Sequence, residues 1–245
     1  MIDNPVALVT GANKGLGRET ARQLGAHGAT VLLGSRDLNR GETAAAELAA
    51  EGIKVSPVQL DVTDVRSVER AAEKIRKEFG VMDILVNNAG GIVETPALSA
   101  TAQDMRATYE TNVFGVVTLT RTMLPLLAAS RAARIVNVSS TSASLSVTSE
   151  PGTIYAAADH ILPYASSKAA LNMLTVQYAQ AFRRDPRYGH MKINSASPGL
   201  TATDLTHHAG ARTVEQGAVV IVKLATLPDN GPSGGYFDEN GPAPW

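Results

Sequence analysis

The sequence contains no cysteine among its 245 residues. Disulfide frameworks and metal or redox sites built on thiolates are therefore excluded. The 22 lysines and arginines are balanced by 23 aspartates and glutamates, and this net charge of −1 argues against a nucleic-acid partner, which would require a basic surface. No apolar run approaches the roughly 18 residues of a membrane span.

The sequence also lacks features that would divide it. No linker rich in proline, glycine or serine, no shift in composition and no internal repeat interrupts it, so we expect one domain spanning residues 1–245. The first apolar strand is expected at residues 6–9, which leaves no room for a signal peptide. Together these features predict a cytoplasmic protein without a membrane partner.

Short apolar segments alternate with segments of helical periodicity along the whole chain. Strands are expected at residues 6–9, 30–33, 55–60, 84–87, 135–138, 192–195 and 235–237. The clearest helical stripe, which we interpret as core packing, consists of Val65, Val68, Ala72, Ile75 and Phe79. Alternating strands and helices predict right-handed crossovers and a parallel sheet.

The first strand runs directly into a glycine-rich segment, Thr10-Gly11-Ala12-Asn13-Lys14-Gly15-Leu16-Gly17. A strand followed by glycines and a helix is typical of a pyrophosphate site. Gly11 would permit the turn, Gly15 the approach of backbone N–H groups to phosphate, and Gly17 the packing of the helix on the sheet. The spacing Gly-x-x-x-Gly-x-Gly departs from the Gly-x-Gly-x-x-Gly fingerprint. The alternative is that these glycines serve only a turn.

Tyr164 and Lys168 are four residues apart in a stretch compatible with a helix, so they share one face. An ammonium group beside a phenol lowers the phenol pKa from about 10 and makes it a better proton donor. The alternative is a solvated pair, since this spacing is common on exposed helices. Upstream, an apolar strand ends at Ser140, where a hydroxyl would either donate to a carbonyl oxygen or merely begin a loop.

These motifs resemble those of a classical short-chain dehydrogenase/reductase, and within that superfamily the carbonyl-reductase-like members. The resemblance covers nearly the whole chain and rests on Thr10–Gly17, Asp61-Val62, Asn87-Asn88-Ala89-Gly90, Asn112, Ser140, Tyr164-x-x-x-Lys168 and Pro198-Gly199-x-x-x-Thr203. It implies an α/β fold with one Rossmann domain. The implied sheet is doubly wound and parallel, with seven strands in the order 3-2-1-4-5-6-7 and helices on both faces.

The resemblance also implies a nicotinamide dinucleotide cofactor and the residues that bind it. The glycine segment would contribute Gly11, Asn13, Lys14, Gly15, Leu16 and Gly17. Asp61 and Val62 would hold the adenine, although Asp61 could instead cap the next helix. The ribose and nicotinamide would contact Asn88, Ala89, Gly90, Pro198, Gly199, Thr201 and Thr203, together with Tyr164 and Lys168. Asn87 is expected to brace the sheet.

The residues after the second expected strand distinguish NADPH from NADH. An acidic side chain there accepts hydrogen bonds from the ribose 2′-hydroxyl of NADH, whereas the 2′-phosphate of NADPH requires a cation. Here Ser35 occupies the acid's usual position and Arg36 follows it, with Lys14 expected to face the same corner. We therefore expect NADPH/NADP+, with NADH less favoured. The alternative is that Asp37 binds the ribose, if the strand ends one or two residues later.

The resemblance implies a mechanism for four residues. A substrate carbonyl oxygen would lie between Ser140 and Tyr164, and Tyr164 would protonate it as hydride reaches the carbon. Lys168 would lower the pKa of Tyr164 and bind the nicotinamide ribose, while Ser140 would stabilise the developing alkoxide. Asn112 would hold a water that links Lys168 to solvent; otherwise it is an ordinary helix asparagine.

The chain departs from the family pattern between Ser140 and Tyr164, which are 24 positions apart. This is roughly 11 residues more than usual, and the extra segment is expected to form a loop beside the substrate entrance. It contains a second tyrosine, Tyr155, but Asp159 follows four residues later and would raise its pKa, so Tyr164 is the better catalytic candidate. Monomer and homo-oligomer both remain open.

These observations favour an NADPH-dependent carbonyl reductase acting on a ketone, aldehyde or quinone. The alternatives are an NAD-dependent alcohol dehydrogenase that oxidises a secondary alcohol, and a dinucleotide-binding sensor without catalysis. In each enzymatic hypothesis the partner is a small carbonyl or alcohol. His207 and His208 are interpreted as solvated loop residues, since no third ligand supports a metal site.

Overall fold

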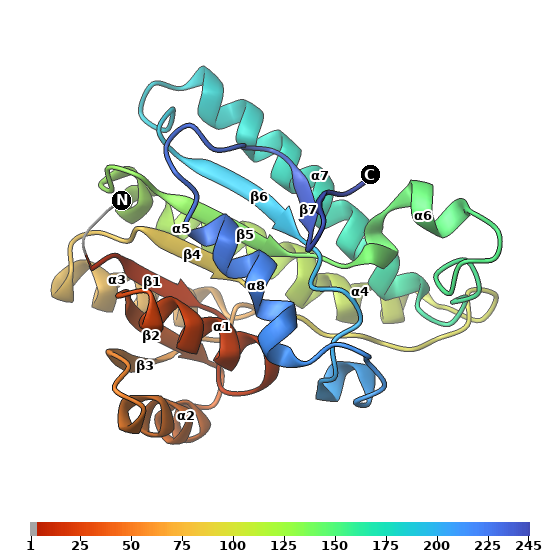
Figure 1. Ribbon diagram of the computed structural model, residues 1–245, viewed down its shortest axis with the longest axis horizontal. Coiled ribbons are helices and arrows are strands. Elements are labelled where there is room, and N and C mark those ends of the chain that lie inside the picture. Colours follow the sequence, from red (N-terminus) through yellow and green to blue (C-terminus); the bar gives the residue numbers. More distant parts are fainter. Residues whose placement is uncertain (1–3) are drawn as a thin grey trace.

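The computed structural model describes residues 4–245 and arranges them as one sheet with helices on both faces (Figure 1). The strands of this part of the chain are β1 (Val6–Val9), β2 (Thr30–Ser35), β3 (Val55–Gln59), β4 (Ile84–Asn87), β5 (Arg134–Val138), β6 (Lys192–Ala196), β7 (Tyr236–Asp238) and β8 (Gly241–Pro242). Their order is β3-β2-β1-β4-β5-β6-β7-β8. The first seven pair in parallel, which confirms the predicted fold class and strand order.

The eighth strand was not predicted. It is a two-residue return in which Gly241 and Pro242 pair antiparallel with Asp238 and Phe237. Gly241 has φ +127°, a backbone conformation that side chains disfavour, and this allows the chain to reverse immediately after β7. The sheet is therefore parallel except at this edge.

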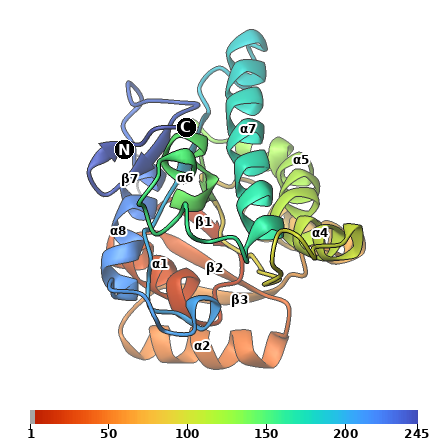
Figure 2. The ribbon, with the colours of Figure 1, turned by 90° about the vertical axis from the view of Figure 1, so that its right-hand side faces the viewer.

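Two layers of helices enclose the sheet. Helices α1 (Gly15–Ala26), α2 (Leu38–Ala50) and α8 (Val214–Ala225) pack on one face, and α3 (Val65–Glu78), α5 (Gly115–Ala128) and α7 (Leu162–Arg184) pack on the other. Figure 2 shows α1 and α8 on one side of the strands and α5 and α7 on the opposite side. Shorter elements join them: α4 (Ala102–Tyr109), the π-helical turn η1 (Glu110–Phe114), η2 (Thr141–Ala143), α6 (Leu145–Ser149) and η3 (Asp204–Thr206).

A hydrophobic core lies on each face of the sheet, and successive residues of each central strand pack into opposite cores. Leu8 packs with the side chains of α3, α5 and α7, whereas its neighbour Val9 packs with those of α1, α2 and α8. Successive side chains of a strand point to opposite faces, and both faces here are covered. This explains why the strands read as continuous apolar runs rather than as alternating patterns.

Some expected boundaries and core positions differ from the structure. β2 continues two residues beyond the expected end at residue 33, because Gly34 and Ser35 still pair with β3. In α3, Val68 and Ile75 are buried as expected, but Val65 is 54% exposed. Val65 is the first residue of α3, immediately after the N-cap Asp64.

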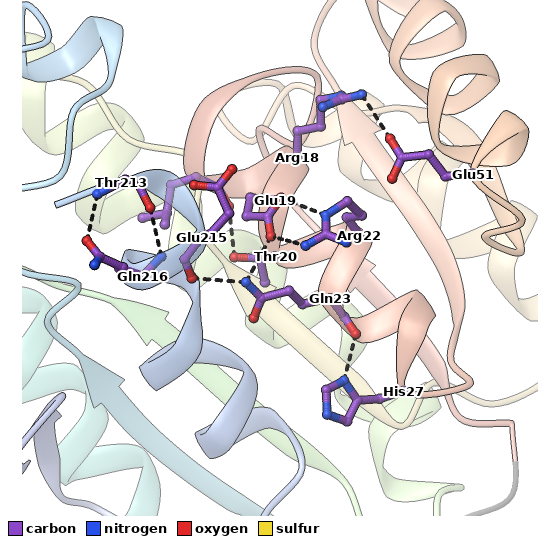
Figure 3. Close-up of polar contacts among 11 residues, drawn as sticks. Arg18, Glu19, Thr20, Arg22, Gln23, His27, Glu51, Thr213, Glu215 and Gln216 are labelled. Atoms are coloured by element: carbon purple, nitrogen blue, oxygen red, sulfur yellow. Dashed lines mark hydrogen bonds and ion pairs between the residues drawn. The ribbon is translucent and has the colours of Figure 1, made fainter.

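A polar cluster around the buried Glu19 fixes α1 against the start of α8 (Figure 3). The carboxylate of Glu19 accepts hydrogen bonds from the Arg22 guanidinium at 2.8 and 2.7 Å and from Gln23 Nε2 at 2.9 Å. Gln23 Nε2 also donates to the backbone oxygen of Glu215 at 3.0 Å. A buried carboxylate is tolerated because it is paired. The C-terminal half of α1 is thereby held against the first turn of α8. Within residues 4–245, every helix is too short or too polar to cross a bilayer.

Candidate active site

A cleft of about 980 Å³ opens at the carboxyl ends of the parallel strands. In an open α/β sheet this edge is where ligands bind. The structure brings nearly all predicted site residues to its walls: Gly11, Asn13, Lys14, Gly15, Leu16, Gly17, Arg36, Asp61, Val62, Asn88, Ala89, Gly90, Ser140, Tyr164, Lys168, Pro198, Gly199, Thr201 and Thr203. Asn112, the remaining predicted residue, lies buried behind this wall.

The glycine segment has the conformation that its sequence suggested. Gly11 and Gly15 have φ of +61° and +55°, which disfavours a side chain at either position. A Cβ on Gly17 would lie 2.4 Å from Asn88 Nδ2 and 2.5 Å from the carbonyl oxygen of Gly11. The backbone is therefore packed too closely for any larger residue. Gly15, Leu16 and Gly17 begin α1 and line the cleft. The first N–H groups of a helix have no partner within it, which suits an anion site.

Asn88 and Thr10 hold this segment in place. Thr10 Oγ1 accepts hydrogen bonds from the backbone nitrogens of Asn88 and Ala89 at 2.9 and 2.8 Å. Asn88 Nδ2 donates to the carbonyl oxygen of Thr10 at 2.8 Å. Asn88 thus borders the cleft as predicted, but its side-chain amide supports the glycine segment. Asn87 braces the sheet as expected, since its Nδ2 donates to Asn137 Oδ1 at 2.8 Å.

Asp61 and Val62 follow β3, which is an edge strand of the sheet, and both line the cleft. Asp61 Oδ1 accepts hydrogen bonds from the backbone nitrogen and hydroxyl of Thr63 at 3.0 and 2.7 Å. The N-cap of α3 is Asp64, whose carboxylate accepts from the backbone nitrogen of Arg66 at 2.9 Å. The helix cap is therefore Asp64, which leaves Asp61 as a cleft residue.

The structure distinguishes Arg36 from Asp37. Arg36 is exposed and lines the cleft. β2 does end two residues later than expected, yet Asp37 caps α2: its carboxylate accepts from the backbone nitrogen of Arg40 at 3.1 Å and lies 3.5 Å from Arg40 Nε. The acid is thus engaged by its own helix, while the guanidinium of Arg36 borders the cleft.

Lys14 and the segment after β6 meet across the entrance of the cleft. The Lys14 ammonium forms an ion pair with Asp204, and the hydrogen bond it donates lowers the pKa of that carboxyl. His208 Nε2 lies 3.0 Å from the same carboxylate, and His207 Nε2 lies 3.4 Å from Glu94. Both histidines are exposed, as expected. Across residues 4–245, no group of three histidines or carboxylates is placed to hold a metal ion.

The segment 198–203 forms the opposite wall. Gly199 has φ +71°, and the hydroxyl of Thr201 donates to the carbonyl oxygens of Pro198 and Gly199, each at 3.2 Å. Thr201 is buried and Thr203 packs over the glycine segment, with its Cγ2 3.7 Å from the position of a Cβ on Gly15. The hydrogen bonds of Thr201 fix the backbone conformation of this segment.

Tyr164 and Lys168 occupy the first turns of α7, as predicted. Pro163 favours a helix start at this point, since it has no N–H to satisfy. Lys168 is 4% exposed, and its Nζ donates to the carbonyl oxygen of Val138 at 2.8 Å. The same ammonium lies 5.6 Å from the centroid of the Tyr164 ring. Ser140, just beyond β5, borders the same part of the cleft.

Burial, rather than Lys168, controls the pKa of Tyr164. Desolvation raises the pKa of the phenol, and the Ser140 hydroxyl offsets only part of that rise. The expected lowering by Lys168 is therefore not the net result, because the ammonium is directed at the carbonyl oxygen of Val138. Burial also lowers the pKa of Lys168 to about 8. Tyr164 consequently holds its proton at neutral pH.

Asn112 lies in the π-helical turn η1 and is fully buried. Its side chain both donates to and accepts from the backbone of Gly91 at 2.9 Å, and its Nδ2 donates to Ser167 Oγ at 3.0 Å. A Cβ on Gly90 would lie 3.3 Å from Asn112 Oδ1 and 3.4 Å from Lys168 Nζ. The side chains of Asn112 and Lys168 therefore both lie next to Gly90. Asn112 is buried behind the cleft wall, whereas Lys168 lines the cleft. π-Helical turns are often found at functional sites.

The inserted segment lies beside the cleft entrance, as expected. Its end pairs with the loop after β4, through hydrogen bonds from Thr95 to His160 at 2.7 Å and from Ala97 to Asp159 at 2.8 Å. Residues 150–160 form a series of turns, so the spacing of four between Tyr155 and Asp159 does not place them on one face. Helical spacing therefore does not set Tyr155 apart from Tyr164 as a proton donor. The insertion contributes to the cleft Ile154, Tyr155, Ala158, His160 and Ile161.

Two residues that contact Ser140 belong to no motif in the sequence and were not predicted as site residues. Ser142 Oγ lies 2.9 Å from Ser140 Oγ, and the Tyr236 hydroxyl donates to the carbonyl oxygen of Ser140 at 2.7 Å. Ser142 lies in an ordinary serine-rich stretch. Tyr236 is 96 positions from Ser140, so only the pairing of β7 with β6 brings it there.

Comparisons with known proteins identify similar chains. A family model described as short chain dehydrogenase matches residues 5–213. The short-chain dehydrogenase anuI of Penicillium roqueforti is 35% identical over 230 residues, covering 92% of this chain and 90% of its own. The (-)-isopiperitenone reductase of Mentha piperita is 35% identical over 305 residues, covering 94% and 95%. The NADPH-bound carbonyl reductase from chicken fatty liver superposes with a TM-score of 0.85 at 26% identity, covering 100% of both chains.

Proposed function

This chain belongs to the short-chain dehydrogenase family, and on that premise we propose that residues 1–245 form one NADPH-dependent carbonyl reductase domain. Its general chemistry is oxidation and reduction at carbonyl and alcohol groups. The observation that carries the proposal is one continuous cleft. It joins a glycine segment suited to phosphate at one end to Ser140, Tyr164 and Lys168 at the other.

The cleft residues fit a dinucleotide. The positive φ of Gly11 and Gly15, the absence of space for a Cβ at Gly17 and the exposed N-terminus of α1 together suit a pyrophosphate. Asp61 would accept from the adenine amino group, and the wall at Thr201 and Thr203 would hold the nicotinamide. When bound, the nicotinamide would supply the hydride.

The chain's own residues would supply the proton and hold the substrate. Ser140 donates a hydrogen bond to the carbonyl oxygen, and Tyr164 donates its proton to that oxygen as charge develops there. The Lys168 ammonium stabilises the phenolate that remains, because it lies 5.6 Å from the centroid of the Tyr164 ring and is itself buried. Asn112, held by Gly91 and Ser167, supports the route by which Lys168 and Tyr164 regain protons.

The cofactor preference would depend on Arg36. Arg36→Asp is expected to weaken NADPH binding by about 100-fold and to improve NADH binding, since a bidentate phosphate contact contributes up to about 3 kcal/mol. Fluorescence titration of both reduced cofactors measures this change. Arg66→Asp, at an exposed position of α3, is the control and should alter neither affinity. An unchanged NADPH/NADH preference in Arg36→Asp would show that the cation is not the determinant.

The glycine segment offers a second test. Gly17→Ala is expected to lower NADPH affinity at least tenfold, because its Cβ would displace the Gly11 carbonyl and the Asn88 amide by several tenths of an ångström or more. The control is Gly189→Ala, an exposed position where a Cβ meets atoms only at 4.0 Å. If Gly17→Ala folds and binds NADPH like the wild type, the phosphate site lies elsewhere.

The substrate would be an apolar ketone of moderate size. The cleft wall includes the aliphatic side chains of Ile92, Ile154, Ile161, Leu200 and Leu205. A relative of this chain is named as a reductase of isopiperitenone, which supports cyclic ketones as first candidates. Consumption of NADPH with a panel of cyclic ketones, aldehydes and quinones tests the proposal. Tight NADPH binding without turnover on any of them would favour the sensor hypothesis instead.

A further inference from the structure

The segment 236–245 packs against the turn that carries Ser140. Tyr236, the first residue of β7, is 3% exposed, and its hydroxyl donates to the carbonyl oxygen of Ser140 at 2.7 Å. β7 reaches this position because it pairs with β6, with Tyr236 opposite Ser195. A residue from the C-terminal edge of the sheet thus contacts the backbone of a catalytic candidate.

The backbone carbonyl and the side-chain hydroxyl of Ser140 have different hydrogen-bond partners. Its carbonyl oxygen accepts from the Tyr236 hydroxyl and from the backbone nitrogen of Ala143 at 2.9 Å. Its Oγ lies 2.9 Å from Ser142 Oγ and accepts from the backbone nitrogen of Ser142 at 3.3 Å. Because Ala143 and Ser142 belong to the same short turn η2, they move with Ser140. Tyr236 ties that turn to the sheet from outside it.

Trp245 covers this contact and connects it to the insertion. Its ring stacks on Tyr236, with centroids 5.5 Å apart and an interplanar angle of 29°. Its carbonyl oxygen accepts from the backbone nitrogen and hydroxyl of Ser146, in α6, at 3.0 and 2.6 Å. Figure 2 shows this end of the chain beside α6. A hydrogen bond shielded from water in this way is stronger than an exposed one.

The Tyr236 phenol remains a donor throughout the working range of pH. Burial raises its pKa to about 12, and the nearby Asp238, Tyr155 and Tyr164 act in the same direction, while Ser197 partly opposes them. It is therefore not a second proton donor for the substrate. Its fixed role is that of a neutral hydroxyl which orients a peptide group.

We infer that Tyr236 is a positioning residue, whose hydrogen bond to the Ser140 carbonyl oxygen aims the Ser140 hydroxyl at the substrate. This inference rests on the proposed reductase function. A misdirected Ser140 would bind the carbonyl oxygen less well in the transition state, where donor geometry matters most. The loss should therefore affect kcat more than the KM for NADPH.

A double-mutant cycle tests this inference. Tyr236→Phe is expected to lower kcat about tenfold, in line with one well-placed hydrogen bond, and to leave the KM for NADPH unchanged. In a Ser140→Ala background, the same substitution should lower kcat less than twofold, because the hydroxyl that it aims is already absent. Tyr178→Phe, on α7 about 20 Å along the helix from Tyr164, is the control and should have no effect on kcat.

Two results would overturn the inference. One is a Tyr236→Phe enzyme with wild-type kcat; the other is an equal loss of kcat in the wild-type and Ser140→Ala backgrounds, which would indicate general disruption. If Tyr236→Phe does not fold, Trp245→Leu removes the cover instead, and its smaller loss of kcat, about threefold, should likewise vanish in Ser140→Ala. A wild-type protein that reduces no carbonyl would refute the reductase function itself, which distinguishes that failure from this one.

Discussion

Tyr164→Phe should lower kcat by at least about a thousandfold while NADPH affinity changes less than about threefold. The substitution removes one hydroxyl and keeps the ring that packs beside Lys168. Burial raises the pKa of Tyr164, so the phenol carries its proton at neutral pH. Ser140 is proposed to donate only a hydrogen bond to the substrate oxygen, whereas Tyr164 is proposed to transfer a proton to it. Steady-state kinetics and fluorescence titration of NADPH measure the two quantities separately.

Tyr155→Phe is the matched control. Tyr155 lines the same cleft and lies close enough to influence the pKa of Tyr164, but it belongs to the turns of the insertion rather than to α7. Its hydroxyl is not aligned with the Lys168 ammonium by a helix. We expect kcat within about threefold of the wild type. A large loss in Tyr155→Phe together with activity in Tyr164→Phe would transfer the role of acid to Tyr155.

Lys168→Met should lower kcat at least about 100-fold and, unusually for an active-site change, raise the melting temperature. The pKa of Lys168 falls from 10.5 to about 8 through burial, so its charged form costs the fold about 3 kcal/mol. Methionine removes that cost and also removes a hydrogen bond to Val138 worth about 1–2 kcal/mol. At pH 7 the net gain of about 1–2 kcal/mol corresponds to a rise of about 3–6 °C.

The pH dependence of this stability difference has a definite sign. Lys168 has a lower pKa in the folded protein than in the unfolded chain, so between about pH 8 and 10.5 the unfolded chain binds the extra proton. The wild type therefore gains stability over that range, and the advantage of Lys168→Met should shrink from pH 7 to pH 10. Lys223→Met, at an exposed position of α8, is the control and should show no such trend. A variant less stable than the wild type at every pH would contradict a costly buried ammonium.

Two parts of the candidate site could be predicted from local sequence because each depends on residues close together in the chain. The turn at Gly11 and Gly15 and the shared face of Tyr164 and Lys168 each depend on neighbouring residues only. Parallel strands then bring those parts to one edge of the sheet, where the cleft lies. The strand order itself was an implication of the family resemblance. The bounds of β2 were less accurate, because its last two residues are fixed by pairing with β3 rather than by their own propensity.

Contacts between distant residues could not be predicted in this way. The partner of Lys14 is Asp204, and the partner of the Ser140 backbone is Tyr236, separated by 190 and 96 positions. Both depend on where loops lie after the sheet has formed. The direction in which the pKa of Tyr164 shifts could not be predicted from the sequence either, because it depends on how far the folded protein buries the phenol. Local sequence patterns can therefore identify candidate residues, but their hydrogen-bond partners and pKa values depend on contacts between distant parts of the chain.

Our central proposal is that hydride passes from NADPH to a carbonyl carbon in this cleft while Tyr164 protonates the carbonyl oxygen. The most direct measurement uses NADPH deuterated at the transferable position of C4, a cyclic ketone and mass spectrometry of the product. We expect an alcohol that carries one deuterium on its carbinol carbon, formed by the wild type and absent with Tyr164→Phe. An alcohol without deuterium, or tight NADPH binding with no alcohol from any ketone, aldehyde or quinone tested, would contradict the claim.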